Sequence, residues 1–142
     1  MKTIPILFII FTFCFGKPAK QLDANMQEWV GGIGSTKGIN YTVTFVMNKS
    51  SDKIIPVKVS LNAADLKFII LKNNKKLNKI KFNKGDTLIF KCSYSENLKL
   101  QDNKHQKINK KKLYITFNCL NSKKQKIIEI TEFKKLKTLM YP

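Results

Sequence analysis

Apolar and polar residues alternate with a period of two over much of the chain from residue 41 onward. Seven segments show this alternation or a short apolar run, and clusters of Asn, Asp, Lys, Ser and Gly separate them. A period of two is typical of β-strands, because successive side chains point to opposite faces of a sheet. The predicted strands are residues 41–47, 55–61, 66–71, 77–82, 88–94, 113–119 and 128–130.

The alternation also predicts which side chains face the core of the domain. Pro56 lacks an N–H group for a strand ladder, so it indicates an edge position within its segment. Segment 66–71 is almost continuously apolar, which favours burial on both faces. The predicted core faces are Tyr41, Val43, Phe45 and Met47; Ile55, Val57, Val59 and Leu61; Ile80 and Phe82; Leu88, Phe90, Cys92 and Tyr94; Leu113, Ile115, Phe117 and Cys119; and Ile128 and Ile130.

Four other segments lack the strand pattern. Residues 17–26 are polar and are expected to form a flexible leader or a first edge segment. Residues 29–38 are rich in glycine and predict a turn region beside an aromatic anchor. Residues 98–112 are too polar to pack and predict a long exposed loop. Residues 133–140 space their apolar side chains by three, which predicts a short C-terminal helical turn.

Short strands with turn signals at about ten-residue spacing are typical of a two-sheet sandwich. We therefore predict an all-β domain over residues 17–142, an antiparallel sandwich of about seven strands that is immunoglobulin-like in architecture. The likeness concerns architecture only. Antibody-type domains place a tryptophan between their two cysteines, whereas Trp29 precedes both Cys92 and Cys119.

Residues 1–16 have the organisation of a cleavable signal peptide. Lys2 supplies a positive start, an uncharged apolar run follows over residues 4–15, and cleavage is expected after Gly16. The run is shorter than the roughly 20 apolar residues that a membrane span needs, and no second long run follows. A retained anchor and a lipid-modified Cys14 are the alternatives, the second disfavoured because Phe13 is not small.

The chain is strongly basic, with 27 Lys+Arg against 9 Asp+Glu and a formal net charge of +18. Every one of these basic residues is lysine. Arginine is the side chain that grips phosphate and carboxylate with two parallel hydrogen bonds, so a dedicated nucleic-acid surface without it is unusual. Abundant Asn, Ile and Phe point to A/T-rich codons. A solvated lysine surface is therefore favoured over a polyanion-binding one.

Two cysteines follow the signal peptide. If segments 88–94 and 113–119 pair as a hairpin, Cys92 and Cys119 lie opposite each other and a disulfide between them is geometrically allowed. Export supports this bond, which would stabilise the fold by about 3–4 kcal/mol in the chain-entropy description. A register shift of two residues would instead leave two buried free thiols.

The sequence offers no catalytic, metal or cofactor constellation, so we expect a protein that is not an enzyme and has no cofactor. His105 is the single histidine and lies between lysines, which disfavour its protonated form and repel metal ions. The carboxylates are few and scattered, and the glycines fit neither a Walker loop nor a dinucleotide-binding turn. A small hydrolase, or an inhibitor of one, is a minor third hypothesis.

The glycine-rich segment provides the best candidate for a contact surface, because an aromatic side chain beside mobile backbone is a common recognition surface. A core position for Trp29 is the alternative and the more favoured one. The predicted contact residues are Trp29, Gly31, Gly32, Gly34 and Tyr41.

Both ends of the chain carry a recognisable pattern. An aromatic residue is followed by glycines at 29–32, a Ser- and Gly-containing stretch leads into a tyrosine strand at 35–41, and the chain ends on Ile-Thr-Glu-Phe-Lys-Lys-Leu…Tyr-Pro at 130–142. This resembles a group of small exported proteins of Bacteroidetes-type bacteria with no assigned function. The resemblance implies a periplasmic, envelope-side or secreted location in a Gram-negative cell and brings no catalytic residues.

Two functions follow as expectations. The first is a non-enzymatic secreted or envelope-side β-sandwich that binds a partner or supports an envelope assembly. The second is a lysine-rich protein that attaches to anionic polymers, such as polysaccharide, extracellular DNA or a membrane surface, through residues 72–84 and 104–112. The expected partners are accordingly an envelope protein or an anionic polymer.

Overall fold

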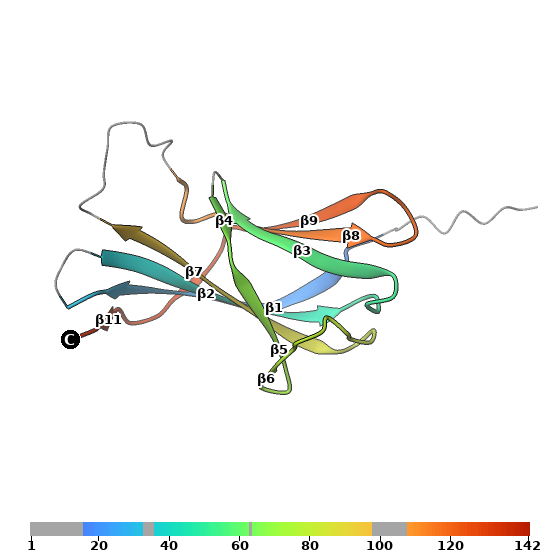
Figure 1. The fold of residues 1–142 in the computed structure, drawn as a ribbon, viewed down its shortest axis with the longest axis horizontal. Helices are drawn as coiled ribbons and strands as arrows, with labels where there is room; N and C mark the ends of the chain where they lie inside the picture. The colour runs from blue at the N-terminus through green and yellow to red at the C-terminus, as the bar shows by residue number, and fades with distance from the viewer. Residues whose placement is uncertain (1–15, 33–35, 63, 98–107) are drawn as a thin grey trace, which may run out of the picture.

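The computed structural model describes residues 16–32, 36–62, 64–97 and 108–142, and within these ranges it is all-β with no helix. None of the described residues therefore forms an apolar helix of membrane-spanning length. The strands form a seven-stranded sheet in the order β10-β1-β2-β7-β5-β6, with β11 also pairing with β1, and a four-stranded sheet in the order β4-β3-β8-β9 (Figure 1). Their bounds are β1 Ala19–Val30, β2 Thr36–Met47, β3 Ile54–Leu61, β4 Ala64–Leu66, β5 Phe68–Lys72, β6 Lys75–Lys76, β7 Thr87–Asn97, β8 Leu113–Cys119, β9 Gln125–Ile130, β10 Lys134–Lys135 and β11 Leu139–Met140.

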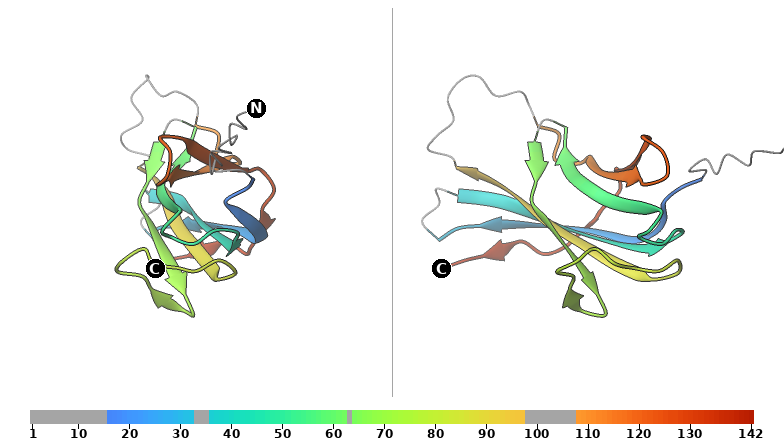
Figure 2. Two further views of the ribbon diagram at one scale, coloured as in Figure 1. Left: turned by 90° about the vertical axis from the view of Figure 1, so that its right-hand side faces the viewer. Right: turned by 45° about the vertical axis from the view of Figure 1, so that its right-hand side comes forward.

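The two sheets lie face to face and enclose one hydrophobic core (Figure 2). Phe90 on β7 lies at its centre. Its ring contacts Phe45 on β2 at a centroid distance of 5.4 Å and Phe68 on β5 at 6.2 Å. Phe117 on β8 reaches Phe90 from the opposite sheet at 6.3 Å. This cluster of four rings joins three strands of the larger sheet to the centre of the smaller one.

The predicted inward faces of the three most regular strands are confirmed. All members of these faces are buried except Tyr94, which is half-buried at the core's margin. The alternation succeeds here because each strand has one face on the core and one toward solvent. The faces are Tyr41, Val43, Phe45 and Met47 on β2; Leu88, Phe90, Cys92 and Tyr94 on β7; and Leu113, Ile115, Phe117 and Cys119 on β8.

A β-bulge makes the prediction for β3 wrong in its first half. Pro56 pairs with Phe117 and Lys58 with Thr116, so Val57 is the extra residue and is exposed. An extra residue reverses the inward and outward positions on either side of it. Ile54 and Pro56 are therefore buried before the bulge, and Val59 and Leu61 after it. Pro56 has no β4 partner, because β4 pairs only with residues 59–61.

The predicted strand 66–71 is two strands that belong to different sheets. Residue 67 separates β4, which pairs with β3, from β5, which pairs with β7. Only Ile70 is fully buried in this segment, so burial on both faces is wrong. The apolar residues are needed here because the chain crosses from one sheet to the other along the core's margin.

One predicted strand is absent, and one strand that was not among the seven predicted segments is present. Residues 77–82 form no strand, and Ile80 is exposed, although Phe82 is buried as expected. β1 is a 12-residue strand, so the expected flexible leader is wrong, whereas the alternative of a first edge segment agrees with residues 19–24, which pair with β2 alone among the described residues. Its polar sequence pairs along all of β2, with a bulge at Leu22, and only Ala19 and Ala24 of its residues are fully buried.

The predicted C-terminal helical turn is wrong. Residues 134–135 and 139–140 form β10 and β11, which pair in parallel with β1. The Leu136 N–H donates to the Met26 carbonyl at 2.8 Å, and the Tyr141 N–H donates to the Val30 carbonyl at 3.0 Å. The open edge of β1 thus satisfies backbone groups that a single helical turn would leave largely unpaired.

The aromatic cluster predicts the largest single loss of stability in the core. Replacing Phe90 by Ala removes contacts with three rings and should lower the free energy of unfolding by about 3–5 kcal/mol. Urea unfolding followed by far-UV circular dichroism measures this loss. The exposed Ile127→Ala is the matched control and should change it by less than about 0.5 kcal/mol. Equal losses in the two variants would contradict the central role of Phe90.

Candidate functional site

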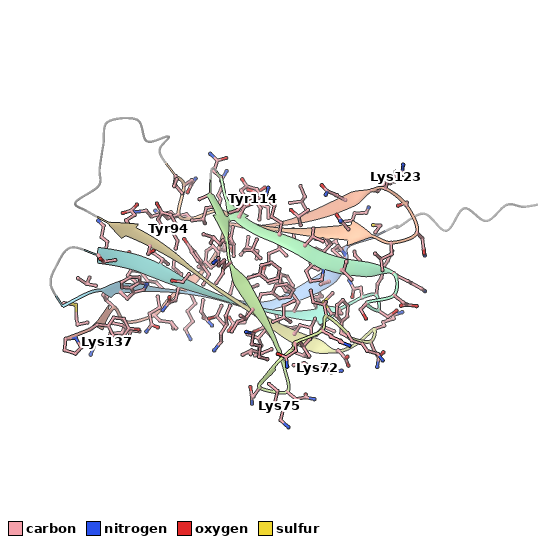
Figure 3. All side chains as sticks on the ribbon, in the orientation of Figure 1. Lys72, Lys75, Tyr94, Tyr114, Lys123 and Lys137 are labelled. Carbon is pink, nitrogen blue, oxygen red and sulfur yellow. The ribbon has the colours of Figure 1, made fainter. Side chains whose placement is uncertain are left out.

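A lysine-rich arm extends from the seven-stranded sheet. We use this name for residues 72–84, which run from the end of β5 through β6 and the loop that follows (Figure 1). Figure 3 shows Lys75 at the tip of the arm, on the side away from the four-stranded sheet. The arm contains no Asp or Glu. Its basic residues are Lys72, Lys75, Lys76, Lys79, Lys81 and Lys84.

A two-residue turn at Asn73 and Asn74 reverses the chain at the tip. Both residues have positive φ angles, 51° and 61°, as a type I′ hairpin turn requires. Asparagine is one of the few residues besides glycine that tolerates this conformation. Lys72 and Lys75 therefore pair across the turn, and the tip carries a lysine on each side.

The base of the arm is fixed to the core. Phe82 is 1 % exposed, and its backbone N–H donates to the Ser51 hydroxyl at 3.0 Å. The Ser51 N–H and hydroxyl both donate to the Phe82 carbonyl, at 3.0 and 3.1 Å. These bonds attach the end of the arm to the turn between β2 and β3.

Asp86 closes the base from the other side. Its carboxylate accepts hydrogen bonds from the Asn83 N–H at 2.8 Å and from the Lys72 ammonium at 2.7 Å. The Asn83 bond and the Lys72 contact hold the pKa of Asp86 below its usual value. The two ends of the arm are therefore bridged, so the lysines between them project from a defined position.

The five remaining lysines of the arm are exposed and form no ion pair with a carboxylate of the described residues. The other ion pairs in the described residues lie elsewhere, for example Lys110 with Glu96 at 2.7 Å. Ile80, 39 % exposed, adds one apolar side chain to the loop. The arm can therefore attract anions by charge.

Tyr41 does not belong to a contact surface, and that prediction is wrong. It is 1 % exposed, and its hydroxyl donates to the Lys110 carbonyl at 2.6 Å. Burial is also the main cause that raises the pKa of the Tyr41 phenol. The residue faces inward on β2, and its ring contacts Phe133. Tyr41 therefore contacts both the segment before β8, at Lys110, and the segment after β9, at Phe133.

Trp29 is half-buried on the outer face of the seven-stranded sheet. It pairs in register with Gly38, and a Cβ at Gly38 would overlap the indole ring and the Tyr94 carbonyl oxygen. The Tyr141 ring contacts the Trp29 ring edge-on at 6.1 Å. Trp29 is therefore not part of the buried core, which was the more favoured alternative, and its ring packs against the backbone at Gly38.

The glycines of the predicted contact surface have different surroundings. Gly31 is half-buried and its N–H donates to the Thr36 carbonyl at 2.8 Å. Gly32 is exposed but lies directly against Tyr141 and Pro142, so the end of the chain covers its Cβ position. Gly34 lies outside the described residues. The segment is thus a hairpin between β1 and β2 that the C-terminal residues adjoin.

The predicted Cys92–Cys119 disulfide is wrong, because Cys92 is a buried free thiol. β7 and β8 do not form a hairpin: β7 pairs with β2 and β5, whereas β8 pairs with β3 and β9. Cys92 lies opposite Tyr41 and Phe68, and Cys119 lies opposite Ile54 in the other sheet. Burial raises the pKa of the Cys92 thiol to about 12.

The described residues contain no group of three or more His, Cys, Asp or Glu side chains that could hold a metal ion. His105, and the other residues of the predicted loop up to residue 107, lie outside the described part of the chain. Residues 108–112 lead into β8 without regular structure of their own.

No protein-family model, no curated protein and no solved structure matches the chain.

The sequence predicts a lysine surface over residues 72–84 but does not predict the arrangement of this segment. The consecutive asparagines Asn73 and Asn74 are a turn signal, because asparagine tolerates positive φ angles. The alternation of Ile80 and Phe82 with lysines was assigned to a strand instead. No local signal indicates that Asp86 and Ser51 fix the base, because both contacts join distant or non-strand segments.

The packing of Trp29 on Gly38 leads to a prediction. Gly38→Ala should destabilise the fold by about 1–3 kcal/mol, because the new methyl group displaces the indole ring. It should also shift the emission of Trp29, the only tryptophan, to longer wavelength. Gly31→Ala is the control, since its nearest neighbour is the Thr36 oxygen at 3.3 Å. Unchanged emission in Gly38→Ala would contradict the packing.

The buried thiol gives a second prediction. At pH 8 a pKa of about 12 leaves roughly one Cys92 in ten thousand as thiolate, against about one in four at the unfolded pKa of about 8.5. Alkylation of Cys92 by iodoacetamide, quantified by peptide mass spectrometry, should be more than about a hundredfold slower in native buffer than in concentrated urea. Rapid native labelling at this residue would show that Cys92 is accessible.

Proposed function

We propose that this protein is an exported, non-enzymatic β-sandwich module that attaches to linear anionic polymers of the cell envelope through its lysine-rich arm. The observation that carries the proposal is the arm itself: five exposed lysines on a fixed base, with no carboxylate in the segment. Most of the described carboxylates that do pair with lysine pair outside the arm. Positive charge is therefore left uncompensated at this projection.

The order of the strands supports an immunoglobulin-like topology. The run β1-β2-β7-β5 in one sheet corresponds to strands A, B, E and D of a constant-type domain. The run β3-β8-β9 in the other corresponds to C, F and G, and β4 then lies where a C′ strand would be. Such sandwiches commonly serve as frames that present binding surfaces, and here the segment between β5 and β7 would be that surface.

The residue type of the arm favours attachment by charge over sequence-specific recognition. Lysine is a flexible point charge, and this chain has no arginine to make paired hydrogen bonds to bases. Binding should therefore depend on the spacing of negative charges along the polymer. A carboxylated or sulfated polysaccharide meets that requirement, and this agrees with an envelope-side location.

Binding of a protein partner at the C-terminal end of β1, near Trp29, is the second candidate function. Met140 is 73 % exposed and Tyr141 lies beside Trp29, so large apolar side chains gather there. Support for an envelope assembly would use this end rather than the arm.

Salt-dependent binding tests the first proposal. The probes are heparin and a DNA duplex, each titrated from low salt to above about 150 mM. The arm variant replaces Lys75, Lys76, Lys79, Lys81 and Lys84 by Gln. The control variant replaces five other exposed lysines by Gln and has the same net charge: Lys37, Lys91, Lys123, Lys134 and Lys137.

The arm variant should bind heparin at least about tenfold more weakly near 150 mM salt, with a shallower slope of log affinity against log salt, because fewer counterions are released. The control variant should weaken binding by less than about threefold. Equal weakening in both variants would mean that only net charge matters. Wild-type binding that vanishes below 150 mM would remove the proposal and direct attention to the Trp29 end.

A further inference from the structure

A cleft opens between the two sheets at the end of the molecule where β1 begins. Residues 16–21 form one wall, residues 126–129 of β9 form the other, and Asn48 lies between them. Its volume is about 840 Å³, within the range of about 300–1,000 Å³ that is usual for ligand sites. Figure 1 shows β9 in one sheet and the start of β1 in the other at this end.

Both walls are strand edges. Four consecutive residues of β9 line the cleft, so it follows the edge of that strand and not one face. β9 is the last strand of its sheet and pairs only with β8 among the described residues. Within the described part of the chain, residues 19–24 of β1 pair with β2 alone, because β10 begins its pairing at Asn25. Backbone N–H and C=O groups on these edges are therefore open to another strand.

The wall on the β1 side is held in place by hydrogen bonds. The Asn48 side-chain amide donates to the Lys17 carbonyl at 3.0 Å. The Asn48 backbone N–H donates to the Pro18 carbonyl, also at 3.0 Å. Pro18 and Ala19 are buried beneath this wall. The cleft is thus a built feature of the fold.

Lysines converge on the cleft from both walls. Lys17 and Lys20 come from the β1 side and Lys126 from β9, and none of the three forms an ion pair with a described carboxylate. Burial, followed by repulsion from Lys126 and Lys53, lowers the pKa of the adjacent Lys49. Glu129 is the carboxylate of the lining, and it already contacts Lys112 at 3.8 Å. A ligand with negative charges would relieve this crowding.

We propose that the β1–β9 cleft binds an extended, acidic peptide segment of a partner protein as an added strand on the edge of β9. Its backbone would continue the four-stranded sheet, and its carboxylates would pair with Lys17, Lys20 and Lys126. Ile127, which is 61 % exposed, would contact its apolar side chains. The lysines of the cleft would repel a second copy of this basic chain, so they disfavour it as the bound strand and favour an acidic partner.

Peptide binding tests the proposal directly. The probe is a dye-labelled, end-capped peptide of about eight residues that alternates Glu and Val, measured by fluorescence anisotropy. A second peptide alternates Glu and Pro: it carries the same charge but lacks N–H groups at the proline positions and forms no strand. The cleft variant is Lys17→Gln, Lys20→Gln and Lys126→Gln, and its matched control is Lys37→Gln, Lys123→Gln and Lys134→Gln.

The Glu-Val peptide should bind at least about tenfold more tightly than the Glu-Pro peptide, because only the first can pair with the β9 edge. The cleft variant should lose at least about tenfold in affinity, and the control less than about threefold. The arm variant should bind the peptide like the wild type, so failure here is separate from failure of polymer binding. Melting temperatures of all variants confirm folding.

Amide hydrogen exchange distinguishes strand pairing on β9 from binding by charge alone, because charge alone would not protect the backbone N–H groups of β9. Bound Glu-Val peptide should slow exchange at those residues of 126–129 whose N–H groups point away from β8, because these groups would donate hydrogen bonds to the added strand. Equal affinity for the two peptides, or unchanged exchange in β9, would overturn the proposal. So would a cleft variant that loses heparin binding but keeps the Glu-Val peptide, since the cleft would then be a polysaccharide site.

Discussion

The contact between Phe90 and Phe117 is the link on which the two-sheet arrangement depends. Phe117 comes from β8 at the centre of the smaller sheet, while Phe90 packs with Phe45 and Phe68 in the larger one. Phe68 also lies just after the chain crosses between the sheets. One ring cluster therefore fixes the sheets to each other and the crossing to both. Burial of these rings is a large part of the hydrophobic driving force.

A core that is almost entirely apolar determines where the charge can lie. Thr116 is the single polar residue in the buried class among the described residues, and it carries no charge. The lysines are consequently confined to turns, edges and solvent faces, where water screens their mutual repulsion. The arm and the cleft are two of the places where the fold brings lysines together. Stability and surface charge are thereby separated, and the surface can vary without cost to the core.

Alternation identified β2, β7 and β8, because each has one face on the core and a regular register over its buried length. It failed at Val57, where an extra residue shifts the pairing. It also missed β1, whose polar residues form a strand through backbone bonds to β2 rather than through burial. The Cys92–Cys119 pairing assumed a hairpin, whereas the partners of β7 and β8 are set by long-range packing. The local pattern of apolar and polar residues does not indicate which strands pair with each other in a sheet.

The arm and the cleft use the same residue type under different physical conditions. On the arm, separate exposed lysines act through long-range attraction, which salt screens within about 10 Å at 0.1 M. In the cleft, Lys126 lies beside open backbone groups, so charge and strand pairing can act on one ligand at short range. Lysines on an open edge ordinarily prevent aggregation by repelling a like-charged strand. The same repulsion leaves the edge available to a segment of opposite charge, and protection against self-association then becomes selectivity for an acidic partner.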